Sequence, residues 1–176
     1  DKQAKSDARD YFRRVLHDFS GAGELGRQLA FQAKRELKEI DEMFIGGRAP
    51  ELEGVTLAGE KLRLSSLRGR VVLVIFWSSS YTEAEDQRKL SERFADQPVT
   101  IIGVSCEAEI EKAFQTVEEN RLAWPTIWDG NHGPIAEAWQ IRSWTSTYLI
   151  DRRGVIRQRD LRWSKEIGDA IESLLR

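Results

Sequence analysis

The clearest pattern in the chain is an uninterrupted apolar run, Val71 to Phe76, followed by a small polar stretch and then a charged segment. The run shows no alternation of apolar and polar positions, which indicates a strand that is buried on both faces. Such a strand is typical of the centre of a parallel α/β sheet with helices above and below. Ligand and catalytic sites in these folds lie beyond the carboxyl ends of the strands. We therefore expect a site at residues 77–85.

Shorter apolar segments and turn residues predict the other elements of an α/β fold. Apolar residues at helical spacing predict helices over about 82–95 and 134–140, one carrying Ile110, Phe114 and Val117, and a last one capped by Ser164. Ser65 to Gly69 predict a short capped turn, and Asp151 to Gly154 a hairpin turn. Further strands are expected near 53–57, 61–64, 99–104, 125–128, 147–150 and 155–159.

The first 47 residues follow a different pattern. Two stretches of helical spacing are separated by Ser20-Gly21-Ala22-Gly23, which predicts a helical hairpin over 1–47 in front of a domain over 48–176. The hairpin either packs on that domain or serves as an arm for dimerisation or partner binding. Its expected apolar faces carry Tyr11, Phe12, Val15, Leu16 and Phe19 in the first helix and Leu25, Leu29, Ala33, Leu37, Ile40 and Phe44 in the second.

Composition excludes several classes of function. The chain has 176 residues, 40% of them hydrophobic and 32% charged, and a net charge of -2 with both signs interspersed, so no basic stripe favours nucleic acid. No apolar run reaches the length of a membrane span, so we expect no membrane insertion within this chain. Because the chain opens on Asp1 rather than on Met, we expect a mature form or an excised part of a larger protein.

The numbers of cysteine and histidine residues further limit the chemistry that is possible. Cys106 is the one cysteine, so an intramolecular disulfide is impossible. His17 and His132 are far apart in sequence, and no Cys/His cluster exists that could hold a structural metal. We expect neither a metal nor a cofactor.

The approach to the apolar strand resembles that of a known family. In thioredoxin-like proteins of the TlpA/ResA type and in the related AhpC/TSA (peroxiredoxin-related) proteins, an Ala-Pro entry leads through a hairpin and a Leu-Ser-x-Leu-Arg-Gly turn into a Val-Val-Leu-Val-x-Phe-Trp strand. The resemblance covers about Ala49 to Arg176. It implies a thioredoxin-like fold, with a central mixed sheet flanked by helices and an N-terminal β-hairpin. The matching positions are Ala49, Pro50, Gly59, Leu64, Ser65, Leu67, Arg68, Gly69, Arg70 and the strand from Val71 to Trp77.

The same resemblance shows which catalytic residues are replaced. Laid on the family's Cys-x-Pro-Cys motif, the two cysteines fall on Tyr81 and Ala84, and the peroxiredoxin cysteine falls on Glu85. The family's cis-proline falls on Thr145, for which we expect a trans peptide bond because a cis bond before a residue other than proline costs about 2.5–4 kcal/mol. Thiol–disulfide exchange needs a thiolate and a resolving cysteine, and neither Tyr81 nor Ala84 supplies one. This predicts a redox-inactive domain.

Cys106 is the main objection to that prediction. It follows the strand 99–104 at its carboxyl end, on the same edge as the replaced motif. Glu107 and Glu109 disfavour a thiolate there, whereas the amides of a following helix would favour one. Two interpretations stay open: a partly buried small hydrophobic residue, or a single reactive thiol.

The residues around the replaced motif predict a binding groove rather than a catalytic centre. The groove would be formed by Trp77, Ser78, Ser79, Ser80 and Tyr81 together with Trp144 and Thr145. The serines are expected to cap the following helix, since a nucleophilic serine would need a base such as His132 within reach. Glu83 and Glu85 suit the positive end of that helix. The tryptophans either pack in the core or line the groove with aromatic surface.

Three functions follow from these observations. The first is a redox-inactive thioredoxin-like module that binds a protein or peptide in the groove. The second is a thiol-dependent oxidoreductase or peroxidase that acts through Cys106 alone. The third is a structural domain of a larger envelope protein. The resemblance to the TlpA type implies an extracytoplasmic location, in the periplasm or cell envelope of a bacterium.

Overall fold

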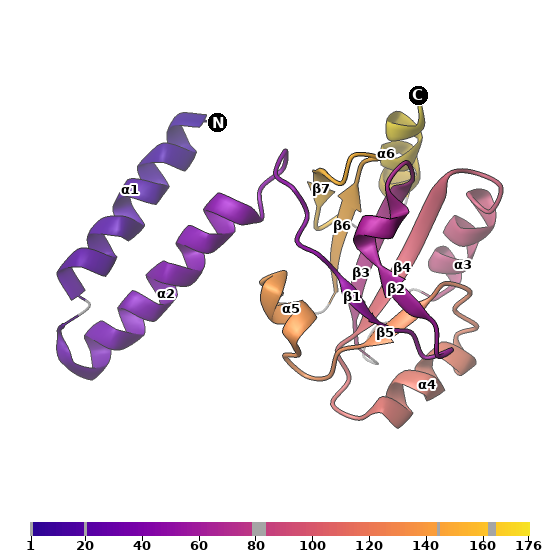
Figure 1. Cartoon of the computed structure of the whole chain (residues 1–176), viewed down its shortest axis with the longest axis horizontal. Helices are drawn as coiled ribbons and strands as arrows, with labels where there is room; N and C mark the ends of the chain where they lie inside the picture. Colours follow the sequence, from indigo (N-terminus) through magenta and orange to yellow (C-terminus); the bar gives the residue numbers. More distant parts are fainter. Residues whose placement is uncertain (1, 20, 79–83, 144, 162–164) are drawn as a thin grey trace.

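A computed structural model shows a helical hairpin followed by an α/β domain (Figure 1). The structure describes residues 2–19, 21–78, 84–143, 145–161 and 165–176. Helices α1 (Lys2–Phe19) and α2 (Gly23–Glu42) lie antiparallel and side by side, and α1 is the helix farther from the α/β domain. The break at Gly21 and Ala22 lies within the predicted interruption. The boundary between 47 and 48 stays a prediction.

The α/β domain is built on a five-stranded mixed sheet in the order β5-β4-β3-β6-β7. The central strand β3 pairs in parallel with β4 and antiparallel with β6, and β5 and β7 form the edges. All seven residues of β3 are buried, as its unbroken apolar run predicts. The strands are β3 (Val71–Trp77), β4 (Val99–Ser105), β5 (Thr126–Trp128), β6 (Ser146–Ile150) and β7 (Ile156–Arg159).

Two apolar cores cover the two faces of this sheet. One core contains Leu73 and Ile75 and is closed by side chains of α3 (Ala84–Arg93), α4 (Ile110–Glu119) and α6 (Lys165–Leu175). The other contains Val74 and Phe76 and is closed by α5 (Pro134–Ala138), the N-terminal β-hairpin and Met43. Alternate side chains of β3 enter opposite cores, which is why the whole strand must be apolar.

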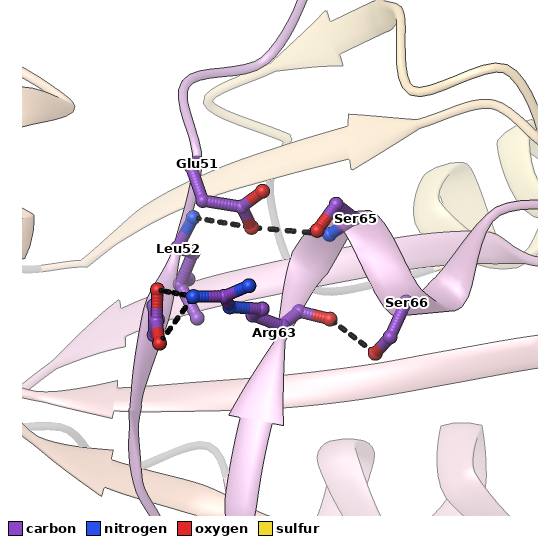
Figure 2. Close-up of polar contacts among 6 residues, drawn as sticks. Glu51, Leu52, Arg63, Ser65 and Ser66 are labelled. Carbon is purple, nitrogen blue, oxygen red and sulfur yellow. Dashed lines mark hydrogen bonds and ion pairs between the residues drawn. The ribbon is translucent and has the colours of Figure 1, made fainter.

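The N-terminal β-hairpin consists of β1 (Glu53–Val55) and β2 (Lys61–Arg63), followed by the 3-10 helix η1 (Leu64–Leu67). Figure 2 shows the polar contacts that hold it: one carboxylate oxygen of Glu51 accepts the amides of Leu52 (3.2 Å) and Ser65 (3.0 Å), and the guanidinium of Arg63 donates to both carboxylate oxygens of Glu53 (2.8 and 2.7 Å). Burial acts to raise the pKa of Glu51, but hydrogen bonds to Ser65 and Leu52 lower it overall.

The seven predicted strands are all present, each with ends within two residues of the prediction. The predicted turn over Ser65 to Gly69 coincides with η1 and the residues after it; the flanking residue Arg63 makes no side-chain cap, and a carboxylate oxygen of Glu51 accepts the Ser65 amide (3.0 Å). Helix α3 is described from Ala84 to Arg93, and the predicted start at residues 82 and 83 lies outside the described residues. The predicted cap Ser164 also lies outside them.

The helical hairpin differs most from its prediction. Of its expected apolar faces, Tyr11, Phe19 and Leu25 remain 61%, 42% and 69% exposed. Two paired helices bury only the stripe where they touch each other, so side chains beside that stripe stay in solvent. An ion pair between Arg142 and Glu36 (2.7 Å) joins the hairpin to the α/β domain. Within the described ranges, no helix combines the length and the apolar character needed to cross a bilayer.

Candidate functional site

The candidate site lies where β3, β4 and β6 meet at one edge of the sheet. Trp77 pairs with Ser105, and the amide of Cys106 donates to the carbonyl oxygen of Trp77 (2.8 Å), so β3 and β4 end side by side. The antiparallel strand β6 begins opposite Phe76, which places Thr145 at the same edge. The structure therefore brings Ser78, Cys106 and Thr145 together, three positions that are far apart in the sequence.

Much of the predicted groove falls outside the described residues. These are Ser79, Ser80, Tyr81 and Trp144, and Glu83 of the predicted helix start lies outside them as well. Ala84 is the first residue of α3, but the side chains of Ala84 and Glu85 are not described either. The predicted roles of all these residues stay predictions. Ser78 and Thr145 are both half-buried, so part of each residue reaches the surface at this edge.

The single thiol is buried. Cys106 is 3% exposed and packs in the core that contains Phe76 and Val104; its Sγ lies 3.9 Å from the Val104 carbonyl oxygen. Burial raises the pKa of the Cys106 thiol to about 12, and the nearby carboxylates of Asp129 and Glu107 add to the increase. Almost none of the thiol is ionised at neutral pH. The structure agrees with the small-hydrophobic interpretation of Cys106, because a reactive cysteine needs a thiolate and access.

The indole of Trp77 does not line a groove. Trp77 is 2% exposed, because its position in β3 directs it into the core closed by α3 and α6. Trp124 and Trp139 are also buried, at 6% and 0% exposed. The prediction that Trp77 presents aromatic surface to a ligand is therefore corrected: for this residue, core packing is the right interpretation.

Aromatic surface instead gathers at the end of β5, beside the candidate site. Trp128 is 36% exposed, and its Nε1 donates to the carbonyl oxygen of Glu107 (2.8 Å), which ties the end of β5 to the segment after Cys106. Phe114 of α4, which the helical pattern groups with Ile110 and Val117, is 48% exposed. Both line a hollow of about 430 Å³ together with Val55, Leu57, Ile110, Ile127, Pro134 and Ile135. This hollow can accept an apolar side chain.

Sequence reasoning missed this hollow. Its walls come from β1, α4, β5 and α5, and no single segment of the sequence holds more than a part of it. The one available signal was the aromatic residue Trp128 directly before an Asp-Gly turn. Asp129 on the rim has a structural role, since its carboxylate oxygens accept the amides of Ile135 (3.0 Å) and Ala136 (2.7 Å) at the start of α5.

His132 belongs to a different surface. It lines a hollow of about 620 Å³ between α2 and the segment after α5, together with Phe12, Arg35 and Ile141. Across the described part of the chain, no cluster of three or more His, Cys, Asp or Glu side chains has an arrangement suited to a metal ion.

Comparison of the sequence with known proteins shows which family and which relatives this chain is similar to. Residues 45–159 match the AhpC/TSA family. The chain is 30% identical to Peroxiredoxin Bcp of Bacillus subtilis over 149 residues, which is 74% of this chain and 94% of that protein. It is 26% identical to the thiol:disulfide interchange protein DsbE of Vibrio cholerae, over 78% of this chain and 79% of that protein.

Solved structures agree with the fold. The thioredoxin domain of a thiol-disulfide oxidoreductase from Bacteroides vulgatus superposes with a TM-score of 0.69 at 26% identity, covering 76% of this chain and 99% of that one.

Protein DipZ of Mycobacterium bovis is 32% identical over 130 residues, which is 63% of this chain but only 18% of DipZ. A domain similar to this one therefore also occurs inside a much longer protein.

Proposed function

Because this chain belongs to the AhpC/TSA family of thioredoxin-like proteins but holds its single cysteine in the core, we propose that it is a redox-inactive member that binds a protein or peptide partner. The observation that carries this proposal is the state of Cys106: 3% exposed, with a pKa of about 12. Thiol–disulfide exchange starts from an accessible thiolate, and Cys106 supplies neither the ionised form nor the access.

The proposed binding surface lies at the carboxyl ends of the strands. Ser78 and Thr145 are half-buried at this edge, and the hollow beside Trp128 and Phe114 offers the apolar surface that an anchoring side chain needs. Contiguous exposed apolar surface of this kind is characteristic of interaction sites. The predicted contributions of Tyr81 and Trp144 belong to the same proposal.

The location is proposed as extracytoplasmic. The support is the similarity to the interchange protein DsbE and to TlpA-type proteins. The similarity to one part of DipZ supports, in the same way, the proposal that this domain functions within a larger protein.

The first test is thiol-dependent turnover. Insulin-disulfide reduction and peroxide consumption are measured with excess dithiothreitol for the native protein and for Cys106→Ser. We expect both proteins to stay at the background rate of the reductant. Activity that the native protein has and Cys106→Ser lacks would make this a one-cysteine redox enzyme and overturn the proposal.

The second test concerns the surface. A photo-crosslinking residue is placed at position 128 and, as the matched control, at exposed position 11 in the helical hairpin. Cells that make either protein are irradiated and the cross-linked proteins are identified. We expect defined adducts from position 128 that Phe114→Ala or Trp144→Ala weakens at least several-fold. Adducts that are equal from both positions, or unchanged by both substitutions, would remove this surface from the proposal.

A further inference from the structure

Three buried polar atoms converge in front of Gly103 in β4. They are the indole Nε1 atoms of Trp77 and Trp124 and the hydroxyl Oγ1 of Thr126. Their residues are 2%, 6% and 3% exposed, and none of the three atoms has a hydrogen-bond partner within the part of the chain that the structure describes. A buried polar group without a partner costs about 1–3 kcal/mol, and three at one place require a common explanation.

Glycine makes the convergence possible. A Cβ atom on Gly103 would lie 2.7 Å from Thr126 Oγ1, 2.9 Å from Trp77 Nε1 and 3.1 Å from Trp124 Nε1. These are the three nearest atoms around that point outside the adjoining residues, and all three are polar although the surrounding core is apolar. Gly103 pairs with Thr126 of β5 and with Ile75 of β3, so the polar atoms come from both sides of β4.

We infer that a single buried water molecule binds here, hydrogen-bonded to Trp77 Nε1, Trp124 Nε1 and Thr126 Oγ1. The numbers of donors and acceptors match a water molecule. Each indole can only donate, and a water oxygen accepts two hydrogen bonds while one of its hydrogens is donated to the threonine oxygen. Its oxygen lies farther from the Gly103 Cα than a Cβ would. Buried waters in proteins make about three such bonds to polar groups that lack other partners.

The chemistry of the site disfavours an ion. Among the described residues, the core around it contains apolar side chains such as Leu73, Ile75 and Ile101, and the three polar atoms carry no charge that would balance a bound ion. Moving an uncompensated charge into such a core is far more costly than burying a neutral water. The three polar atoms include no carboxylate and no imidazole that could ligate a metal.

The water would hold the indole of Trp77 in place beneath the candidate site. Trp77 is the last residue of β3 and directly precedes the polar stretch that replaces the family's redox motif. The water joins its indole to Trp124 and Thr126, across β4. The proposed function does not depend on this water. An experiment can therefore contradict the water site without contradicting the proposed function, and the reverse.

The test is nuclear magnetic resonance of the intact chain with 15N-labelled tryptophan. Trp77→Phe and Trp124→Phe assign the two indole signals, and dipolar cross-peaks between each Nε1 proton and water are recorded. We expect both indoles to show cross-peaks with the sign of a long-lived bound water. Absence of the cross-peak at either indole would overturn the inference, as would chemical shifts of both indoles that change when chloride is replaced by sulfate at constant ionic strength.

A matched pair of variants tests the third ligand. Thr126→Ser keeps the hydroxyl and is expected to keep both cross-peaks. Thr126→Val keeps the shape but removes the hydroxyl, and we expect it to lose both cross-peaks. Unchanged cross-peaks in a folded Thr126→Val would contradict the site as described. If Thr126→Val does not fold, the cross-peaks between water and the two indoles in the native protein still decide whether the water site exists.

Discussion

The helical hairpin and the α/β domain treat their apolar residues in opposite ways. In the α/β domain, Trp139 after α5 and every residue of β3 are at most 2% exposed, because helices and the β-hairpin cover both faces of the sheet. In the hairpin, Leu25 and Phe31 are 69% and 63% exposed, although both lie on a helix with apolar periodicity. Both regions contain regularly placed apolar residues, but only the sheet has packed layers on both faces that bury them.

The comparison shows where stability and function are expected to reside. A two-layer or three-layer arrangement removes apolar area from water on every side, whereas a pair of helices removes it only along one seam. Substitutions of equal chemical size should therefore have large effects in the α/β domain and small effects in the hairpin. Five predictions test this, from the largest expected effect to the smallest.

The largest effect is expected at Trp139. Its ring is fully buried and lies 5.6 Å from the ring of Phe76 and 5.1 Å from that of Tyr148. Trp139→Ala should lower the free energy of unfolding by about 3–5 kcal/mol, because it leaves a large cavity. Leu25→Ala in the hairpin should change it by less than about 0.5 kcal/mol. Urea unfolding followed by far-ultraviolet circular dichroism measures both, and equal losses would contradict the comparison.

The same comparison can be made for polar groups, between the mostly buried carboxylate of Asp151 in the α/β domain and an exposed carboxylate in the hairpin. Its carboxylate accepts the amides of Arg153 and Val155 (both 2.9 Å) and the Nε of Arg157 (2.8 Å), and its side chain is 11% exposed. Asp151→Asn should cost about 1–3 kcal/mol at pH 7. Asp10→Asn, at a 57% exposed side chain in α1, should have no measurable effect.

The Asp151 effect should depend on pH. Burial acts to raise the pKa of Asp151, but hydrogen bonds from Val155, Arg157 and Arg153 lower it below the unfolded value. The stabilisation is therefore complete above the unfolded pKa, about 3.9, and is lost as pH falls through the lower folded pKa. The stability difference between the native protein and Asp151→Asn should shrink in acid. A difference that is the same at pH 7 and pH 2 would contradict this.

Because of Cys106, we expect the free energy of unfolding to decrease at alkaline pH. The thiol pKa is raised from about 9 to about 12 by burial and by Asp129 and Glu107, so the unfolded chain ionises this thiol first as pH rises. The contribution is fully present below pH 9 and is lost between about pH 9 and 12. From pH 8 to pH 10 the native protein should lose about 1.4 kcal/mol more than Cys106→Ala, from urea unfolding at both values. Parallel losses in the two proteins would place Cys106 in contact with solvent.

The smallest effect is expected where the two regions meet. The ion pair between Arg142 and Glu36 is 2.7 Å long, but the two side chains are 43% and 33% exposed. A double-mutant cycle with Arg142→Gln and Glu36→Gln should give a coupling energy below about 1 kcal/mol that decreases in high salt. A coupling energy of several kcal/mol would mean that the hairpin is held to the domain far more firmly than its exposed apolar residues suggest.

The sequence predicted the elements well because they depend on local patterns. The unbroken run of β3 indicated burial on both faces, and the Asp151–Gly154 turn is the predicted hairpin turn, closed by a 2.8 Å bond from the Gly154 amide to the Asp151 carbonyl oxygen. The absence of a cysteine pair was also visible in the sequence alone, because Cys106 is the one cysteine. These conclusions need only residue type and spacing.

Other features depended on which segments become neighbours. Phe114 and Trp128 came to share an exposed hollow only because α4 and β5 meet β1 and α5 there. Trp77, Trp124 and Thr126 came to face Gly103 only because β4 lies between β3 and β5 in a particular register. Spacing along the chain reports which face of its own element a residue occupies. It does not report what another element places opposite that face, because this is set by strand order and packing. By itself, then, the sequence determined the fold and the loss of the paired thiols, and the tertiary structure decided the surroundings of each side chain.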